Sequence, residues 1–85
     1  MVQEGDYVAI FNSIHRVMKA EKILKERRLR ILLIPVPRAL HSDCGLAIRY
    51  SEEDREAVEK ALEESRLLPD ERYRKNEEKF IPVSG

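Results

Sequence analysis

Cys44 is the only cysteine among the 85 residues of the chain, and it is the residue with the clearest chemical potential. A lone cysteine cannot close an intramolecular disulfide, so its chemistry is that of a single thiol. It follows Ser42 and Asp43 in a loop-like segment rather than in an alternating apolar run, which favours a reactive thiol over an inert buried one. Gly45 comes next and leaves room beside the thiol for atoms of a second molecule.

Polar and basic residues precede this cysteine. Arg38, His41 and Ser42 lie within six residues of Cys44. Positive charge and a nearby helix N-terminus both favour the thiolate, which is the form that attacks sulfur. We therefore predict that Cys44 is the reactive residue and that Arg38 and Ser42 support it. There are three candidate metal ligands, His15, His41 and Cys44, but no clear fourth. We therefore expect neither a metal nor a cofactor.

The hydrophobic pattern predicts the elements that must position the thiol. Apolar runs and alternation predict strands, and apolar residues three and four apart predict helices. The expected strands are 7–11, 30–36, 45–50 and 79–83, and the expected helices are 14–27 and 51–65. Pro82 restricts the last strand to a sheet edge. Residues 69–78 are predicted to be a polar connector.

Polar residues are predicted to begin both helices. Either Asn12 or Ser13 could cap the first helix, because their side chains accept hydrogen bonds from free amides. The run from Ser51 to Asp54 resembles a capping box for the second helix, with aspartate in the place of glutamate. Three acidic residues in that first turn also suit the helix dipole.

This order of elements, β-α-β-β-α with a C-terminal edge strand as an option, is the ferredoxin-like split β-α-β pattern. We expect an α+β fold in which two helices cover one face of an antiparallel sheet. Residues 1–66 would form a single ferredoxin-like domain. Residues 67–85 would be a C-terminal extension, with an edge strand at 79–83.

The topology has a consequence for the candidate site. The end of the first strand, the start of the first helix and the hairpin between the second and third strands share one end of the sheet. Residues 12–15 should therefore lie close to residues 38–45. Ser13 and His15 would then approach Cys44, with His15 as a hydrogen-bond partner or proton shuttle if it is not merely solvated.

Charge is dense but balanced, with 16 basic and 16 acidic residues. This balance argues against binding to nucleic acid or to a membrane surface. The basic run between Lys22 and Arg30 lacks aromatic residues, so it is predicted to be a solvated helix end. The chain has no apolar run of membrane-spanning length and no signal-peptide pattern. With a single cysteine, these features indicate a cytoplasmic protein in a reducing compartment.

Several of these segments carry a resemblance to a known family. The runs IPVPR at 34–38 and SDCGLAIR at 42–49, the run FNS at 11–13, and His15 resemble the small bacterial proteins called Putative Se/S carrier-like. The resemblance extends from Tyr7 to Leu62. It implies a sulfur or selenium carrier in which Cys44 is the carrying residue.

Two functions follow as hypotheses. In the first, Cys44 relays a persulfide or selenopersulfide between a donor and an acceptor protein, and the chain is a carrier rather than a turnover enzyme. In the second, the chain is a ferredoxin-like ligand-sensing or subunit-interaction module in which Cys44 is structural. The sequence leaves open which chalcogen is carried, the identity of the partners, and whether the protein is a homodimer.

Overall fold

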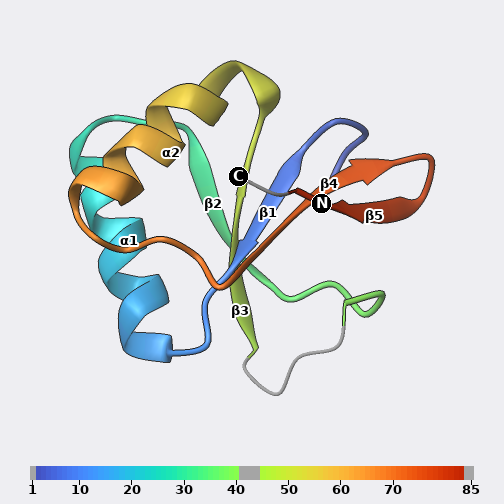
Figure 1. The fold of residues 1–85 in the computed structure, drawn as a ribbon, viewed down its shortest axis with the longest axis horizontal. Helices are drawn as coiled ribbons and strands as arrows, with labels where there is room; N and C mark the ends of the chain where they lie inside the picture. The colour runs from blue at the N-terminus through green and yellow to red at the C-terminus, as the bar shows by residue number, and fades with distance from the viewer. Residues whose placement is uncertain (1, 41–44, 84–85) are drawn as a thin grey trace.

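Five strands and two α-helices make up this computed structural model, which describes residues 2–40 and 45–83 (Figure 1). The elements are β1 (Tyr7–Ile10), α1 (Ile14–Glu26), β2 (Ile31–Pro35), β3 (Leu46–Tyr50), the 3-10 turn η1 (Glu52–Asp54), α2 (Arg55–Glu64), β4 (Glu71–Asn76) and β5 (Lys79–Pro82). The strands form one sheet in the order β2-β3-β1-β4-β5, and every neighbouring pair is antiparallel. The predicted α+β class is confirmed.

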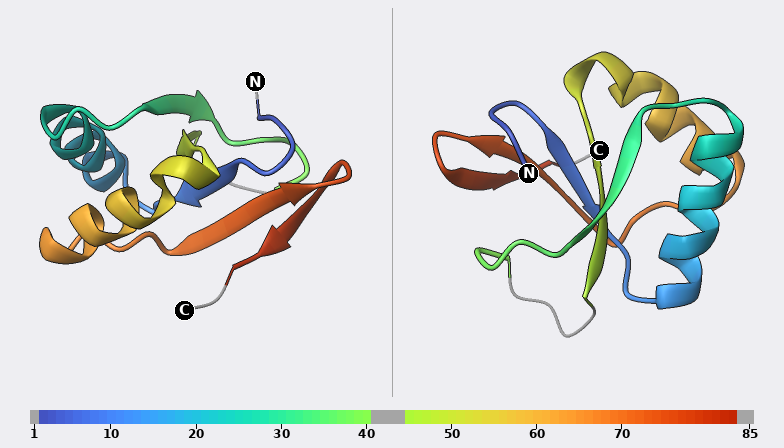
Figure 2. Two further views of the ribbon diagram at one scale, coloured as in Figure 1. Left: turned by 90° about the horizontal axis from the view of Figure 1, so that it is seen from above. Right: turned by 180° about the vertical axis from the view of Figure 1, so that it is seen from behind.

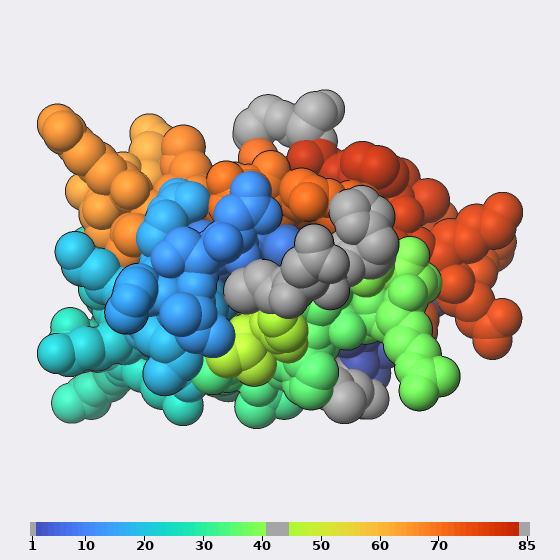
Figure 3. Space-filling view, turned by 90° about the horizontal axis from the view of Figure 1, so that it is seen from below, coloured from blue at the N-terminus to red at the C-terminus, as the bar shows by residue number. Residues whose placement is uncertain are grey.

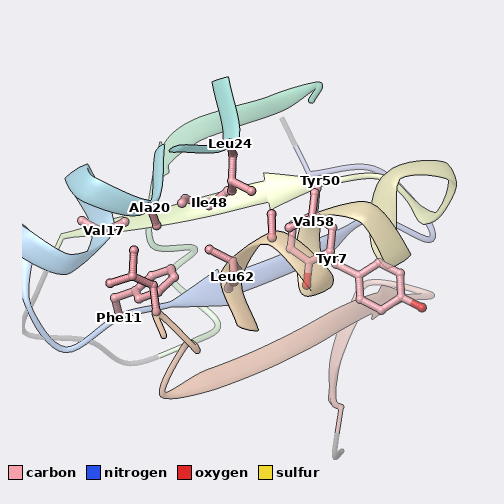
Figure 4. Close-up of a cluster of buried hydrophobic side chains, with 12 residues drawn as sticks. Tyr7, Phe11, Val17, Ala20, Leu24, Ile48, Tyr50, Val58 and Leu62 are labelled. Carbon is pink, nitrogen blue, oxygen red and sulfur yellow. The ribbon is translucent and has the colours of Figure 1, made fainter. Parts of the chain in front are cut away.

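Both helices lie on one face of the sheet, as expected, and the main core fills the space between them and the strands (Figures 2 and 4). Each helix contributes an apolar stripe spaced three and four residues apart, which places those side chains on one side of the helix. The buried members from the helices are Val17, Ala20, Leu24, Val58, Ala61 and Leu62, and those from β1 and β3 include Tyr7, Ala9, Ile48 and Tyr50.

The other face of the sheet has a smaller core of its own. Val8, Ile10, Ile34 and Ala47 are buried there. Partly buried side chains cover them from the N-terminal segment, from the chain after β2 and from the C-terminal hairpin; they are Val2, Val36, Leu40, Tyr73 and Phe80. Because β1 is buried on both faces, its sequence is continuously apolar instead of alternating.

The prediction of a connector over 69–78 is wrong. Residues 71–76 form β4, which pairs with β1 on one side and with β5 on the other. The expected strand at the sheet edge is confirmed as β5. The two-residue turn between them consists of Glu77 and Glu78, whose φ angles are 49° and 68°. Such turns usually carry Asn-Gly or Asp-Gly, so this hairpin gave no recognisable sequence signal.

The two helices begin differently. Ser13 caps α1, and its Oγ accepts a hydrogen bond from the amide of Arg16 at 3.4 Å, as predicted. The capping box at Ser51 is not formed, because the Ser51 hydroxyl donates to Asp54 Oδ2 at 3.2 Å rather than accepting from a backbone amide. The segment starts instead with η1, and α2 begins only at Arg55.

Candidate functional site

One end of the sheet gathers some of the segments that the sequence assigned to the site. β1 ends there, α1 begins there, and β2 leads toward β3 there (Figure 1). In the view of Figure 3, atoms from the start of α1 adjoin atoms from the start of β3. The strand register agrees, because Ile10 lies opposite Ala47 and Pro35 lies opposite Leu46.

The central residue of the prediction lies outside the described part of the chain. Cys44, His41 and Ser42 all fall within the segment 41–44, and their roles stay predictions. The backbone on either side of this segment is described. Val36 donates its amide to the carbonyl oxygen of Gly45 at 3.0 Å, which continues the β2–β3 ladder by one pair.

Gly45 is exposed, and a Cβ atom added to it would meet no other heavy atom within 4 Å. Its backbone is therefore not held in a tight packing contact with the described residues. The described residues thus leave the space beside Gly45 open, and its use by a second molecule stays a prediction.

Arg38 is exposed in a turn that Leu40 closes by donating its amide to the carbonyl of Pro37 at 2.9 Å. It lines a surface hollow of about 480 Å³ between the chain after β2 and the C-terminal hairpin. Lys75 and Glu78 line the same hollow. The chain after β2 thus packs on the face of the sheet opposite α1, where Val36 and Leu40 join the smaller core. The prediction that Arg38 lies beside Ser13 and His15 is therefore wrong: its described neighbours belong to the C-terminal hairpin and the N-terminal segment.

Ser13 and His15 occupy the first turn of α1 but differ in what they do there. The Ser13 hydroxyl is engaged as the helix cap. His15 is exposed, on the side of α1 opposite the buried Val17 and Leu24. The structure therefore explains Ser13 by its structural role and leaves the His15 imidazole facing solvent.

Sequence reasoning missed Asp70, which lies at this end of the sheet. Its Oδ2 accepts from the Asn12 amide at 2.7 Å and from Arg16 Nη1 at 3.1 Å. Arg16 also donates to the carbonyl of Leu68, and its guanidinium lies 5.6 Å from the centre of the Phe11 ring. Asp70 is 58 residues away from Asn12 in the sequence, so no local pattern could reveal the contact.

The Asp70 carboxylate changes the electrostatics of the start of α1. No acidic residue lies in the first turn of this helix, so within the helix its positive end is not neutralised. Asp70 supplies a negative charge there from outside the helix and pairs with Arg16. Asp70 therefore offsets part of the positive charge at the start of α1.

Arg49 is the other arginine near the cysteine in sequence. Its Nη1 lies 2.9 Å from Asp6 Oδ2, and the Asp6 side chain is only 10% exposed. The same carboxylate oxygen accepts from the Gln3 amide at 2.9 Å. Arg49 is thus committed to holding the N-terminal segment against the sheet, which leaves Arg38 as the better placed of the two for an anion.

Within residues 2–40 and 45–83, no three His, Asp or Glu side chains are arranged to hold a metal ion. No helix in that part of the chain is long and apolar enough to cross a membrane.

The fold and the gathered segments define a class: a small α+β protein whose candidate thiol belongs to the segment that connects two adjacent antiparallel strands, β2 and β3. The chain belongs to the family described as Putative Se/S carrier protein-like, whose sequence model matches residues 6–74. That match continues past Leu62 into β4, further than the resemblance seen in the sequence. No curated protein and no solved structure matches the chain.

Proposed function

We propose that this protein carries a sulfur or selenium atom on Cys44 and passes it between partner proteins. The observation that supports the proposal is membership of a family named for such carriers, over residues 6–74. The matched range contains the arginine of the PVPR run, Arg38, and the Cys44-Gly45 pair.

The chemistry needs only one thiol on the carrier. The Cys44 thiolate attacks the outer sulfur of a persulfide on the donor protein, so a new S–S bond forms on Cys44. The S–S bond in the donor breaks, and the donor leaves as a thiolate. In the second step, an acceptor nucleophile attacks the outer sulfur on Cys44, and Cys44 leaves as a thiolate. A selenium atom in the outer position follows the same two displacements.

The surrounding residues have separate parts in the proposal. The open space at Gly45 supports access by the donor and the acceptor. Arg38, exposed at the adjacent hollow, would attract the anionic thiolate or persulfide. Ser13 would position the start of α1 through its cap, Ser42 would donate a hydrogen bond, and His15 would exchange protons at the site.

The test is a sulfur-loading experiment followed by intact-mass measurement. The chain is incubated with a cysteine desulfurase and cysteine, and one sulfur atom should add to it and be removed by a thiol reductant. The Cys44→Ser variant should gain no sulfur. The proposal fails if no adduct forms on the native chain, or if the adduct persists in the serine variant.

Alkylation separates the carrier from the interaction module in which Cys44 is structural. A carrier thiol should react rapidly with iodoacetamide at pH 6 to 7, because its thiolate is stabilised. A structural thiol should be protected until the protein unfolds. Slow alkylation that accelerates only in denaturant would favour the module.

Two broader assignments accompany the carrier function. The β2-β3-β1-β4 order, with β3 between β1 and β2, supports a ferredoxin-like unit to which β5 is added. A reducing cytoplasm is the proposed setting, since a lone carrier thiol must stay reduced between transfers.

A further inference from the structure

The sheet has two outer edges, and they differ in what they offer a partner. At the β5 edge, Val83 donates its amide to the carbonyl of Arg72 at 2.9 Å, so the alternation of the ladder turns the backbone groups of Phe80 and Pro82 outward. Proline has no amide hydrogen, and therefore only Phe80 presents an outward donor. This edge is poorly suited to pairing with another strand.

The β2 edge is better equipped. The amide of Val36 bonds to the carbonyl of Gly45, and so Leu32 and Ile34 also direct their backbone groups toward β3. The residues between them direct theirs outward, which gives amide donors at Ile31 and Leu33. Their carbonyls and the carbonyl of Pro35 are outward acceptors. Within the residues that the structure describes, no strand pairs with this side of β2.

We propose that a second copy of this chain binds at the β2 edge, antiparallel, about a two-fold axis at Leu33. In this register all five residues of each β2 strand face the other strand. Each Leu33 amide donates to the Leu33 carbonyl of the other copy, and each Ile31 amide donates to the Pro35 carbonyl of the other copy. Every outward donor is satisfied, and the only outward groups of β2 left without a partner are the two Ile31 carbonyls, because Pro35 has no amide to donate to them.

Exposed apolar side chains flank the same edge. Leu32 is 45% exposed, and in the proposed register it would lie opposite Ile34 of the second copy. Edge strands that avoid pairing usually carry a charge, yet β2 has none across its five residues. The strand therefore lacks a protecting charge, and its one proline, Pro35, lies at its end rather than among its outward donors.

Helix α1 adds a complementary stripe above this edge. Arg27 reaches Glu64 of α2 at 2.8 Å, which fixes the side of α1 that faces α2. Ile14 and Met18 lie on the opposite side and are 47% and 46% exposed. Glu21 and Lys25, paired at 3.4 Å, continue that stripe. An antiparallel copy would bring two such stripes together, with apolar residues and charges of both signs on each.

The arrangement keeps the two candidate sites apart. The chains leave β2 toward residues 36–40 at opposite ends of the paired strands. Five paired residues span about 17 Å at roughly 3.4 Å each. The backbone hydrogen bonds between the two β2 strands, and not a disulfide, would hold this dimer together. The dimer proposal therefore does not depend on the sulfur-carrier proposal.

Sedimentation analysis of matched variants tests the interface. Leu32→Lys places a charge at the β2 edge, and Ile81→Lys makes a similar change on the β5 strand, where Ile81 is 44% exposed. We expect the native chain, Ile81→Lys and Cys44→Ser to be dimers. Leu32→Lys should dissociate with a Kd raised about tenfold or more, and circular dichroism should show that it remains folded.

Hydrogen exchange supplies a second measurement that does not depend on a variant. The amides of Ile31 and Leu33 should exchange slowly in the dimer and rapidly after dilution to monomer. A monomeric native chain at the highest concentration it tolerates would overturn the proposal. A dimer in which these two amides exchange rapidly, or which Leu32→Lys leaves intact, would also overturn it.

Discussion

At the scale of single residues, Gly45 is the described residue closest in sequence to the candidate thiol. The described residues leave the space beside it open, so none of their packing contacts requires glycine at this position. In the carrier proposal this open space gives a partner access to Cys44. A substitution at Gly45 can therefore separate the effect on sulfur transfer from the effect on folding stability.

We predict that Gly45→Val folds normally but transfers sulfur at least about tenfold more slowly, because its side chain occupies the space beside Cys44. Thermal unfolding and the rate of adduct formation measure the two effects. Ala57→Val, on the exposed side of α2, is the control: it should leave the rate of adduct formation unchanged and lower stability only slightly, because valine is a weaker helix former than alanine. Unimpaired transfer in Gly45→Val would show that the open space is not used.

At the scale of secondary-structure elements, both helices end with the same motif. Arg28 and Arg66 have φ angles of 60° and 56°, a left-handed conformation that favours glycine. In each case the following leucine donates its amide back into the helix, Leu29 to Leu24 at 3.1 Å and Leu67 to Leu62 at 2.8 Å. These are Schellman motifs, and their leucine pairs connect the helix ends to the core.

We expect Arg28→Gly to stabilise the protein by about 1 kcal/mol, because glycine adopts this conformation without the steric cost that arginine incurs. The matched control is Lys22→Gly, an exposed position inside α1, which should destabilise by about 1 kcal/mol. Urea unfolding measures both. Loss of stability in Arg28→Gly would mean that the Arg28 side chain contributes more than its backbone strain costs.

The C-terminal half of the sheet is built from polar sequence. β4 is largely charged and only partly buried, yet it pairs with β1 over four residues. Arg72 of β4 forms an ion pair with Glu59 of α2 at 3.1 Å. The charged residues of this segment favoured a connector in the sequence, but in the fold the charge of Arg72 is paired. Pairing with the buried β1 backbone, rather than β4's own hydrophobicity, places this strand.

The tyrosines connect local packing to the stability of the whole molecule. The Tyr7 and Tyr50 rings are stacked with centroids 5.5 Å apart, and Arg55 donates to the Tyr7 hydroxyl at 2.9 Å. Burial, reinforced by the charge of Glu59, raises the pKa of Tyr50. Burial is also the main cause that raises the pKa of Tyr7.

Folding stability should therefore fall as the pH rises above about 10, the pKa of an unperturbed tyrosine. Above that pH the unfolded chain loses the Tyr50 proton while the folded chain keeps it, so the unfolded state binds fewer protons and is favoured. Urea unfolding from pH 8 to pH 11 measures the slope, to which Tyr50 contributes at most about 1.4 kcal/mol per pH unit. Tyr50→Phe should flatten the curve, and parallel curves for both proteins would contradict this assignment.

The sequence by itself determined the elements whose patterns are local. The stripe containing Val17 and Leu24 predicted α1, and the apolar runs predicted β1, β2 and β3. The pair Asn12-Ser13 predicted a helix cap, and the structure shows that Ser13 is the capping residue. These signals depend on periodicity and on neighbouring residues, so they need no knowledge of the fold. The lone Cys44 and its neighbours likewise indicated a candidate thiol without any tertiary information.

Only the tertiary structure decided the features that join distant segments. The pairing of β4 with β1 and the Asp70 carboxylate at the start of α1 depend on contacts across more than fifty residues. The Glu77–Glu78 turn had no signature in the sequence, because glutamate rarely adopts the positive φ angles that both residues have here. Backbone pairing and ion pairs at such separations leave no periodic trace in the sequence, because their energy depends on which segments the rest of the fold brings together.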